Sequence, residues 1–111
     1  MLPRRWRLKS PLVFAAAYRR GRKLRADGFM CWRLPQAAKT PTQIGIVVSK
    51  KVSLLAAKRN LYRRRLWAAV RENKNIFSTQ GEAIVIVAMA TIAKQTYASL
   101  NHQIKSIFKV S

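Results

Sequence analysis

Apolar residues recur along the first part of the chain at a spacing typical of a helix. Within the stretch 11–20, Phe14 and Tyr18 are four residues apart and share one side of a helix. Ser10 stands where an N-cap is expected, and Gly21 follows the last residue of the pattern. The pattern therefore predicts a short helix over 11–20.

Extended and apolar stretches between turn residues predict strands before and after the middle of the chain. Residues 22–25 lead into a stretch that alternates weakly between apolar and polar positions, and a β-branched run and a strongly hydrophobic run follow later. The predicted strands are 22–25, Phe29–Leu34, Ile44–Val48 and Ala83–Met89, with a loop at Lys39–Thr42 and a turn at Ser78–Glu82.

Two further stretches have the 3.6-residue period of amphipathic helices. The stretch Leu54–Asn73 collects Leu55, Tyr62, Leu66, Ala69 and Val70 on one side. The C-terminal stretch, from about Thr96, repeats Tyr97, Leu100, Ile104, Ile107 and Phe108. The predicted order is α-β-β-β-α-β-α, which makes residues 1–111 a single-domain α+β sandwich of sheet and helices.

The charge balance is strongly basic. Of 111 residues, 23 are Lys or Arg and 3 are Asp or Glu, so the formal net charge is +20. The only carboxylates are Asp27, Glu72 and Glu82, the only imidazole is His102, and the only thiol is Cys31. These residues are too few to form a carboxylate metal cluster, a zinc site or a nucleophile with its base. We expect no catalytic residue, and no metal held tightly by the protein alone.

Compartment is indicated by cysteine usage and by the short apolar runs. One cysteine permits no intramolecular disulfide, which favours a reducing cytoplasm. The uncharged run Ala83–Ala93 is too short to span a bilayer. The cations before Pro11 and the apolar stretch 11–18 have the outline of a signal peptide, but basic residues follow at once and the same stretch predicts a helix. We therefore expect a cytoplasmic protein with no membrane partner.

The strongest functional signal runs from the end of the β-branched strand into the long helix. Seven basic residues lie between Lys50 and Arg65, and no acid occurs until Glu72. Arginine offers a planar fork to phosphate oxygens, and Asn60 can bond a base edge or a 2′-hydroxyl. This pattern predicts an RNA-binding surface rather than an idle solvated face.

The segment "GIVVSKKV…AAKRNLYRRR" resembles the signature of the bacterial ribonuclease P protein subunit. That family has a Gly-x-x-Val-Ser/Ala-Lys-Lys strand end followed by a helix with an Arg-Asn-Arg-x-x-Arg/Lys-Arg type motif. Arg7-Leu8 with Phe14, Tyr18 and Gly21 matches the family's N-terminal pattern, so the resemblance extends over nearly the whole chain. It implies a ribosomal-protein-type fold with a left-handed β-α-β crossover, against the usual right-handed preference.

The resemblance also implies a role in an endoribonuclease holoenzyme whose RNA subunit carries the chemistry and holds the Mg²⁺. The partners would be the ribonuclease P RNA and precursor tRNA, with no obligate protein partner. Residues expected to bind the RNA subunit are Lys50, Lys51, Lys58, Arg59, Asn60, Arg63, Arg64, Arg65 and Arg71. Residues expected to bind the 5′ leader of precursor tRNA are Arg7, Phe14, Tyr18 and Ser49.

Two positions depart from the family pattern. Leu61 stands where the third residue of the Arg-Asn-Arg core is expected, and Trp67 stands where another Arg is frequent. Arg65 and Arg71 are candidates to compensate, while Trp67 is open to stacking on a base or packing against a neighbour. The alternative functions are a structural rRNA-binding protein with no processing role and a cationic membrane-surface protein.

Overall fold

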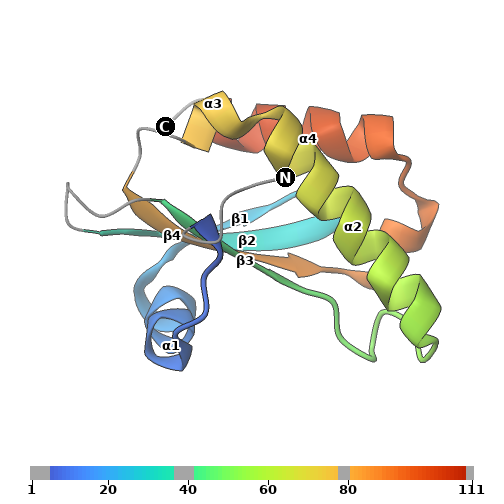
Figure 1. Cartoon of the computed structure of the whole chain (residues 1–111), viewed down its shortest axis with the longest axis horizontal. Helices are drawn as coiled ribbons and strands as arrows, with labels where there is room; N and C mark the ends of the chain where they lie inside the picture. The colour runs from blue at the N-terminus through green and yellow to red at the C-terminus, as the bar shows by residue number, and fades with distance from the viewer. Residues whose placement is uncertain (1–5, 37–41, 78–80, 110–111) are drawn as a thin grey trace.

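The computed structural model describes residues 6–36, 42–77 and 81–109 and contains one sheet with helices on both of its faces (Figure 1). The predicted loop 39–42 and turn 78–82 lie mostly outside the described residues. In chain order the elements are α1 (Pro11–Arg20), β1 (Arg22–Arg25), β2 (Phe29–Pro35), β3 (Gln43–Val47), α2 (Ala56–Glu72), α3 (Lys74–Phe77), β4 (Glu82–Ala88), the 3₁₀ helix η2 (Ala90–Lys94) and α4 (Tyr97–Lys109).

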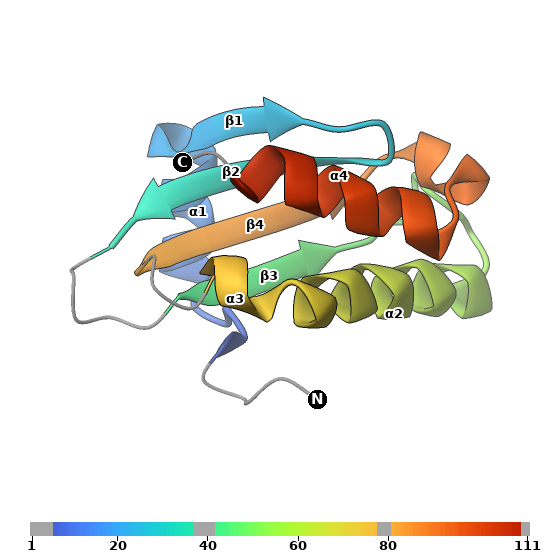
Figure 2. The ribbon, with the colours of Figure 1, turned by 90° about the horizontal axis from the view of Figure 1, so that it is seen from above.

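The four strands form one mixed sheet in the order β1-β2-β4-β3. β2 pairs antiparallel with β1 and β4, whereas β3 and β4 are parallel with Ile44 opposite Ile84. In Figure 2, with α2 and α4 toward the viewer, the chain leaves β3, returns through α2 in front of the sheet and enters β4. This crossover is left-handed, so the predicted α+β architecture and its unusual handedness are confirmed.

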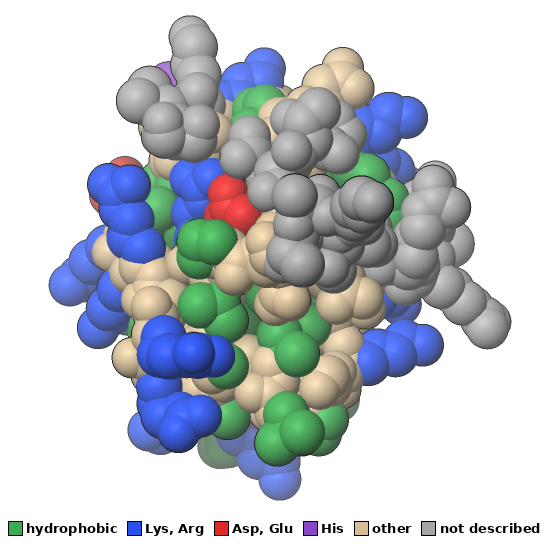
Figure 3. Space-filling model, turned by 90° about the vertical axis from the view of Figure 1, so that its left-hand side faces the viewer, with side chains coloured by type: hydrophobic (Ala, Val, Ile, Leu, Met, Phe, Trp, Pro, Cys, Tyr) green, Lys and Arg blue, Asp and Glu red, His purple; other side chains and the backbone are tan. Residues whose placement is uncertain are grey.

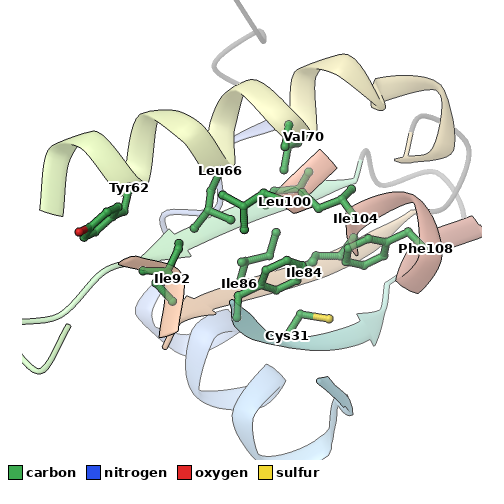
Figure 4. Close-up of a cluster of buried hydrophobic side chains, with 14 of the residues drawn as sticks. Cys31, Tyr62, Leu66, Val70, Ile84, Ile86, Ile92, Leu100, Ile104 and Phe108 are labelled. Atoms are coloured by element: carbon green, nitrogen blue, oxygen red, sulfur yellow. The ribbon is translucent and has the colours of Figure 1, made fainter. Parts of the chain in front are cut away.

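The main core lies between one face of the sheet and the pair α2 and α4 (Figure 4). Phe29, Cys31 and Ile84 project from the sheet, because alternate strand residues point to the same face. Leu66 of α2 and Leu100 of α4 meet them and are fully buried. The predicted apolar stripes of both long helices are thus the surfaces that close this core.

The prediction that Leu55 belongs to the buried apolar side of α2 is wrong. It is the N-cap residue of the helix, and its side chain is 64% exposed. The buried apolar stripe begins about two turns later, at Tyr62, because residues before Ala56 do not have helical geometry. Tyr97, at the first position of α4, likewise remains 39% exposed rather than joining the core.

Among the described residues, the second face of the sheet is covered by α1 and by Leu8 of the N-terminal segment. A smaller cluster there contains Leu8, Ala17, Ala83 and Val85 as buried members. Six residues packed against this cluster remain partly exposed: Val13, Phe14, Trp32, Leu34, Val47 and Val87. This face is therefore apolar, and the described part of the chain covers it incompletely.

The limits of α1 agree with the sequence pattern. Ser10 is the N-cap, with its Oγ 3.4 Å from the backbone nitrogen of Val13. Gly21 closes the helix by donating its N–H to the carbonyl of Ala17 at 2.8 Å. Its φ is −71°, so glycine is favoured here by close backbone approach: an added Cβ would lie 3.3 Å from the carbonyl oxygen of Arg33.

A bidentate ion pair lies at the end of the sheet near Phe108. Arg33 donates from Nε and Nη2 to the two carboxylate oxygens of Glu82, at 2.8 and 2.6 Å. Within residues 6–36, 42–77 and 81–109 it is the only salt bridge. The other described cations therefore have no carboxylate partner within that part of the chain. No helix among the described residues is long and apolar enough to cross a membrane.

Candidate nucleic-acid interface

A groove lies along the exposed side of α2, against the N-terminal segment. It has a volume of about 640 Å³ and its lining includes four arginines and no carboxylate. We call it the α2 groove; it is lined by Arg7, Asn60, Arg63, Arg64, Trp67, Ala68 and Arg71. Its helical members face away from the main core, except that part of Trp67 also packs against that core. The sequence-predicted cationic face is therefore an actual concave surface.

Arg7 reaches the α2 groove because the N-terminal segment runs beside β3. The backbone of Arg7 forms a parallel bridge with Ile44, and the N–H of Leu8 donates to the Ile44 carbonyl at 2.9 Å. Successive side chains of an extended segment point in opposite directions. Leu8 therefore enters the second core, while the Arg7 guanidinium lies 5.2 Å from the centroid of the Trp67 ring.

Asn60 and Arg63 are held together on the rim of the α2 groove. Arg63 Nη1 donates to Asn60 Oδ1 at 2.6 Å. Arg64 and Arg71 are exposed and take part in no described ion pair. Guanidinium groups without carboxylate partners are well suited to bidentate bonds with phosphate oxygens.

The loop between β3 and α2 carries the next group of predicted residues. Ser49, Lys50 and Lys51 are all exposed, and Ser49 Oγ accepts from the Lys51 N–H at 3.3 Å. Lys58 is exposed on the first turn of α2. The structure thus places Ser49, predicted to bind the leader, in the loop with the two lysines predicted to bind the RNA subunit.

Arg59 and Arg65 lie apart from the α2 groove. Arg59 Nη1 donates to the carbonyls of Ser53 and Leu54, at 2.9 and 3.0 Å, and so fastens the loop to the helix. Arg65 points to the other side of α2, where its Nη1 lies 3.5 Å from the carbonyl oxygen of Gln95. Only part of the predicted cationic set therefore converges on one surface, and Arg7 joins it from the set predicted to bind the leader.

Phe14 and Tyr18 lie on the incompletely covered face of the sheet. The Phe14 ring lies over Gly45, where an added Cβ would come 2.7 Å from Phe14 Cε1. Tyr18 is 43% exposed, and its ring packs edge-on against Trp32 with centroids 5.0 Å apart. Partial burial raises the pKa of the Tyr18 phenol above its ordinary value.

Trp32 and Lys23 are site candidates that the sequence interpretation missed. Trp32 is half-buried beside Tyr18, and Lys23 Nζ lies 5.6 Å from the centroid of its ring. The strand alternation contained the signal, because Trp32 stands opposite in phase to the core residues Phe29 and Cys31. We call Phe14, Tyr18, Trp32 and Lys23 the aromatic face. In Figure 3, hydrophobic side chains and Lys or Arg side chains are interspersed in the lower half, toward α1.

The acidic side chains do not form a metal site in the described part of the chain. Glu82 is committed to Arg33, and no three His, Cys, Asp or Glu residues among those described are close enough to hold an ion. His102 is exposed on α4, and Cys31 is buried in the main core. The donor set present suits phosphate binding rather than coordination of Mg²⁺.

A sheet with a cationic groove along one helix and an open aromatic face defines an RNA-binding α+β protein. The family model for ribonuclease P matches residues 2–110. The ribonuclease P protein component of Pseudanabaena is 36% identical over 96% of this chain and 91% of that protein. That of Rippkaea orientalis is 34% identical over 96% of this chain and 86% of that protein. The chain belongs to the ribonuclease P protein family.

Solved structures agree with the fold. The ribonuclease P protein of Staphylococcus aureus superposes with a TM-score of 0.81 at 20% identity, covering 95% of this chain and 94% of that one. That of Thermotoga maritima gives a TM-score of 0.80 at 20% identity, covering 93% and 94%. The chain functions in tRNA 5′-end processing, as the protein part of an endoribonuclease that is a ribonucleoprotein. The comparisons do not support the alternative of a purely structural rRNA-binding protein.

Proposed function

We propose that the two surfaces divide the RNA partners between them. The α2 groove, with the Ser49–Lys51 loop, binds the catalytic RNA subunit, and the aromatic face binds the single-stranded 5′ leader of precursor tRNA. The observation that carries this division is that α2, which lines the groove, and α1, which carries Phe14 and Tyr18, lie on opposite faces of the sheet (Figure 1). One protein can therefore contact a folded RNA and a strand that protrudes from it.

The chemistry of each surface supports its assignment. Four guanidinium groups in the α2 groove have no carboxylate partner among the described residues, which favours the dense phosphates of a folded RNA. The rings of Phe14, Tyr18 and Trp32 favour unpaired bases, because every base offers a π-face and stacking requires little sequence preference. Lys23 beside Trp32 adds a cation for the strand's backbone.

Hydrolysis in the holoenzyme is assigned to the RNA subunit. Mg²⁺ bound by RNA phosphates would supply the attacking water, and the protein would neutralise phosphates and hold the substrate. The described side chains serve this role without contributing a carboxylate. The site of action would be the cytoplasm, and no protein partner is required.

Reconstitution tests this function. The full chain is mixed with a bacterial ribonuclease P RNA at low Mg²⁺, and cleavage of precursor tRNA is measured. We expect Phe14→Ala to weaken binding of precursor tRNA about fivefold or more while leaving mature tRNA unaffected, since one base stack contributes about 1–3 kcal/mol. Equal losses for both tRNAs would show that the aromatic face does not hold the leader.

A further inference from the structure

Trp67 is not explained by phosphate binding. Its side chain is half-buried: one part packs against the main core, and another part lines the α2 groove. The four charged side chains in that lining are all arginines. An indole offers phosphate only one N–H, whereas its ring offers a large flat surface to another ring.

We propose that the α2 groove holds one unpaired nucleotide of the catalytic RNA, with its base stacked on Trp67 and its flanking phosphates bound by the arginines. The proposal rests on the proposed function, because it names the element of the RNA that this surface recognises. It also assigns a role to the position where the chain carries Trp instead of a further cation.

The arrangement of charge around the ring supports this assignment. The Arg7 guanidinium lies over the Trp67 ring, 5.2 Å from its centroid. A base that stacks on the ring takes this place, and Arg7 moves outward to the phosphate beside that base. Arg64 and Arg71 approach the groove from α2 itself. Within an RNA strand, each nucleotide is flanked by one phosphate before it and one after it. Arginines that reach the Trp67 ring from two different elements can therefore bind both phosphates of a nucleotide whose base stacks on that ring.

The dimensions of the groove are also suitable. Its volume of about 640 Å³ falls within the range of about 300–1,000 Å³ found for sites that hold small organic molecules. Ala68 contributes to the lining with only a methyl group, which leaves space beside the Trp67 ring. Asn60 stands at the rim, with an amide that can bond a base edge.

The catalytic RNA is a better source of this nucleotide than the leader. The α2 groove is lined by α2, which covers one face of the sheet, whereas the aromatic face lies between the sheet and α1, which covers the other face (Figure 1). Paired bases stack on each other within a helix and do not present a free π-face. The site therefore selects a loop, bulge or end of the folded RNA.

Salt dependence separates stacking from phosphate binding. We measure the Kd of the full chain for a ribonuclease P RNA transcript at several KCl concentrations and fixed Mg²⁺. Trp67→Leu should raise Kd by about 5- to 150-fold, which corresponds to about 1–3 kcal/mol for one stacked base, with an unchanged salt slope. Trp67→Tyr, which retains a ring, should recover most of the affinity.

Three further variants accompany Trp67→Leu, and the first of them protects the test against a folding defect in that variant. Ala68→Gln fills the groove without altering the core side of Trp67, and it should weaken binding with an unchanged slope. Arg64→Gln should instead reduce the slope by about 0.7–0.9, as expected for the loss of one phosphate contact. Lys105→Gln, an exposed cation on α4 away from the groove, is the matched charge control. Circular dichroism melts establish that each variant is folded.

The outcomes are distinguishable. If Arg64→Gln weakens binding but Trp67→Leu and Ala68→Gln bind as the wild type does, the nucleotide site is wrong and the RNA-binding surface stands. If none of the three changes the Kd, the proposed function of the α2 groove is itself wrong. If Trp67→Leu weakens only precursor tRNA with its leader, and not the catalytic RNA, the assigned source of the nucleotide is overturned.

Discussion

The ring of Phe14 lies on the backbone of Gly45, so that the second face of the sheet provides a seat for the aromatic side chain of α1. An added Cβ at Gly45 would lie 2.7 Å from Phe14 Cε1 and 3.5 Å from Leu8 Cβ. A separation of 2.7 Å between two carbon atoms is shorter than van der Waals contact allows, so a larger residue at Gly45 displaces the Phe14 ring. The glycine that begins the "GIVVSKK" segment is thereby linked to the aromatic face.

Gly45→Ala should therefore reduce leader binding without contacting the leader. We expect the affinity for precursor tRNA to fall about threefold or more as the Phe14 ring is displaced, since stacking on one ring contributes about 1–3 kcal/mol. Overpacking should lower the free energy of unfolding by about 1–3 kcal/mol. Competition binding with precursor and mature tRNA measures the first effect, and a similar loss for mature tRNA would contradict it.

Glu82→Gln should destabilise the protein strongly. Arg33 is 7% exposed and Glu82 is 8% exposed, so the substitution leaves a buried guanidinium without its carboxylate. Breaking a buried pair in this way lowers the free energy of unfolding by about 3–5 kcal/mol. Urea denaturation measures the loss, and the double variant Arg33→Met, Glu82→Leu should recover most of it. A single variant as stable as the wild type would show that the pair has no structural role.

Periodicity alone located most of the elements, because each long helix and each strand buries one regular stripe. Tyr62 and Leu66 of α2 and Leu100 and Ile104 of α4 are buried as their spacing predicts. Leu55 broke the rule, since its exposure depends on where the first turn of α2 begins. The short elements α3 and η2 were missed because four or five residues are too few to show a helical period.

The site was harder to predict than the fold. Composition and spacing identified the cationic side of α2, but not that Arg59 turns back to the Ser53 and Leu54 carbonyls. The convergence of Arg7 on Trp67 joins residues 60 positions apart and depends on the pairing of the N-terminal segment with β3. The left-handed crossover came from family resemblance, because periodicity carries no information on handedness.

Arg59 is expected to act on the loop rather than on RNA phosphates. Arg59→Ala removes the bonds to the Ser53 and Leu54 carbonyls and should increase amide hydrogen exchange across residues 49–55. Affinity for the RNA subunit should fall because Lys50 and Lys51 lose their fixed positions, while the salt slope remains that of the wild type. A slope reduced by about 0.7–0.9 would show instead that Arg59 binds a phosphate directly.

The Cys31 thiol should make the free energy of unfolding depend on pH in the alkaline range. Burial raises the pKa of Cys31 from 9.0 to about 12. Above pH 9 the unfolded chain therefore loses this proton before the folded protein does, and the free energy of unfolding falls until the folded thiol titrates. Cys31→Ala lacks this dependence, so the difference in stability between the two proteins should change by about 2 kcal/mol between pH 9 and 11. A difference independent of pH would contradict burial of the thiol.

Polyanions should stabilise the folded chain, because its net charge is +20 and only one ion pair is found among the described residues, so cations repel one another in the compact state. A polyanion that binds only the folded form adds about 2.7 kcal/mol at a hundredfold excess over its Kd. For a domain of this length that corresponds to a rise in Tm of about 10 °C or more. Thermal melts in sulfate, phosphate or RNA are compared with melts in chloride at the same ionic strength, which separates binding from screening. The triple variant Arg63→Gln, Arg64→Gln, Arg71→Gln should lose much of the rise, since these residues line the α2 groove. An equal rise in chloride would mean that screening alone relieves the repulsion.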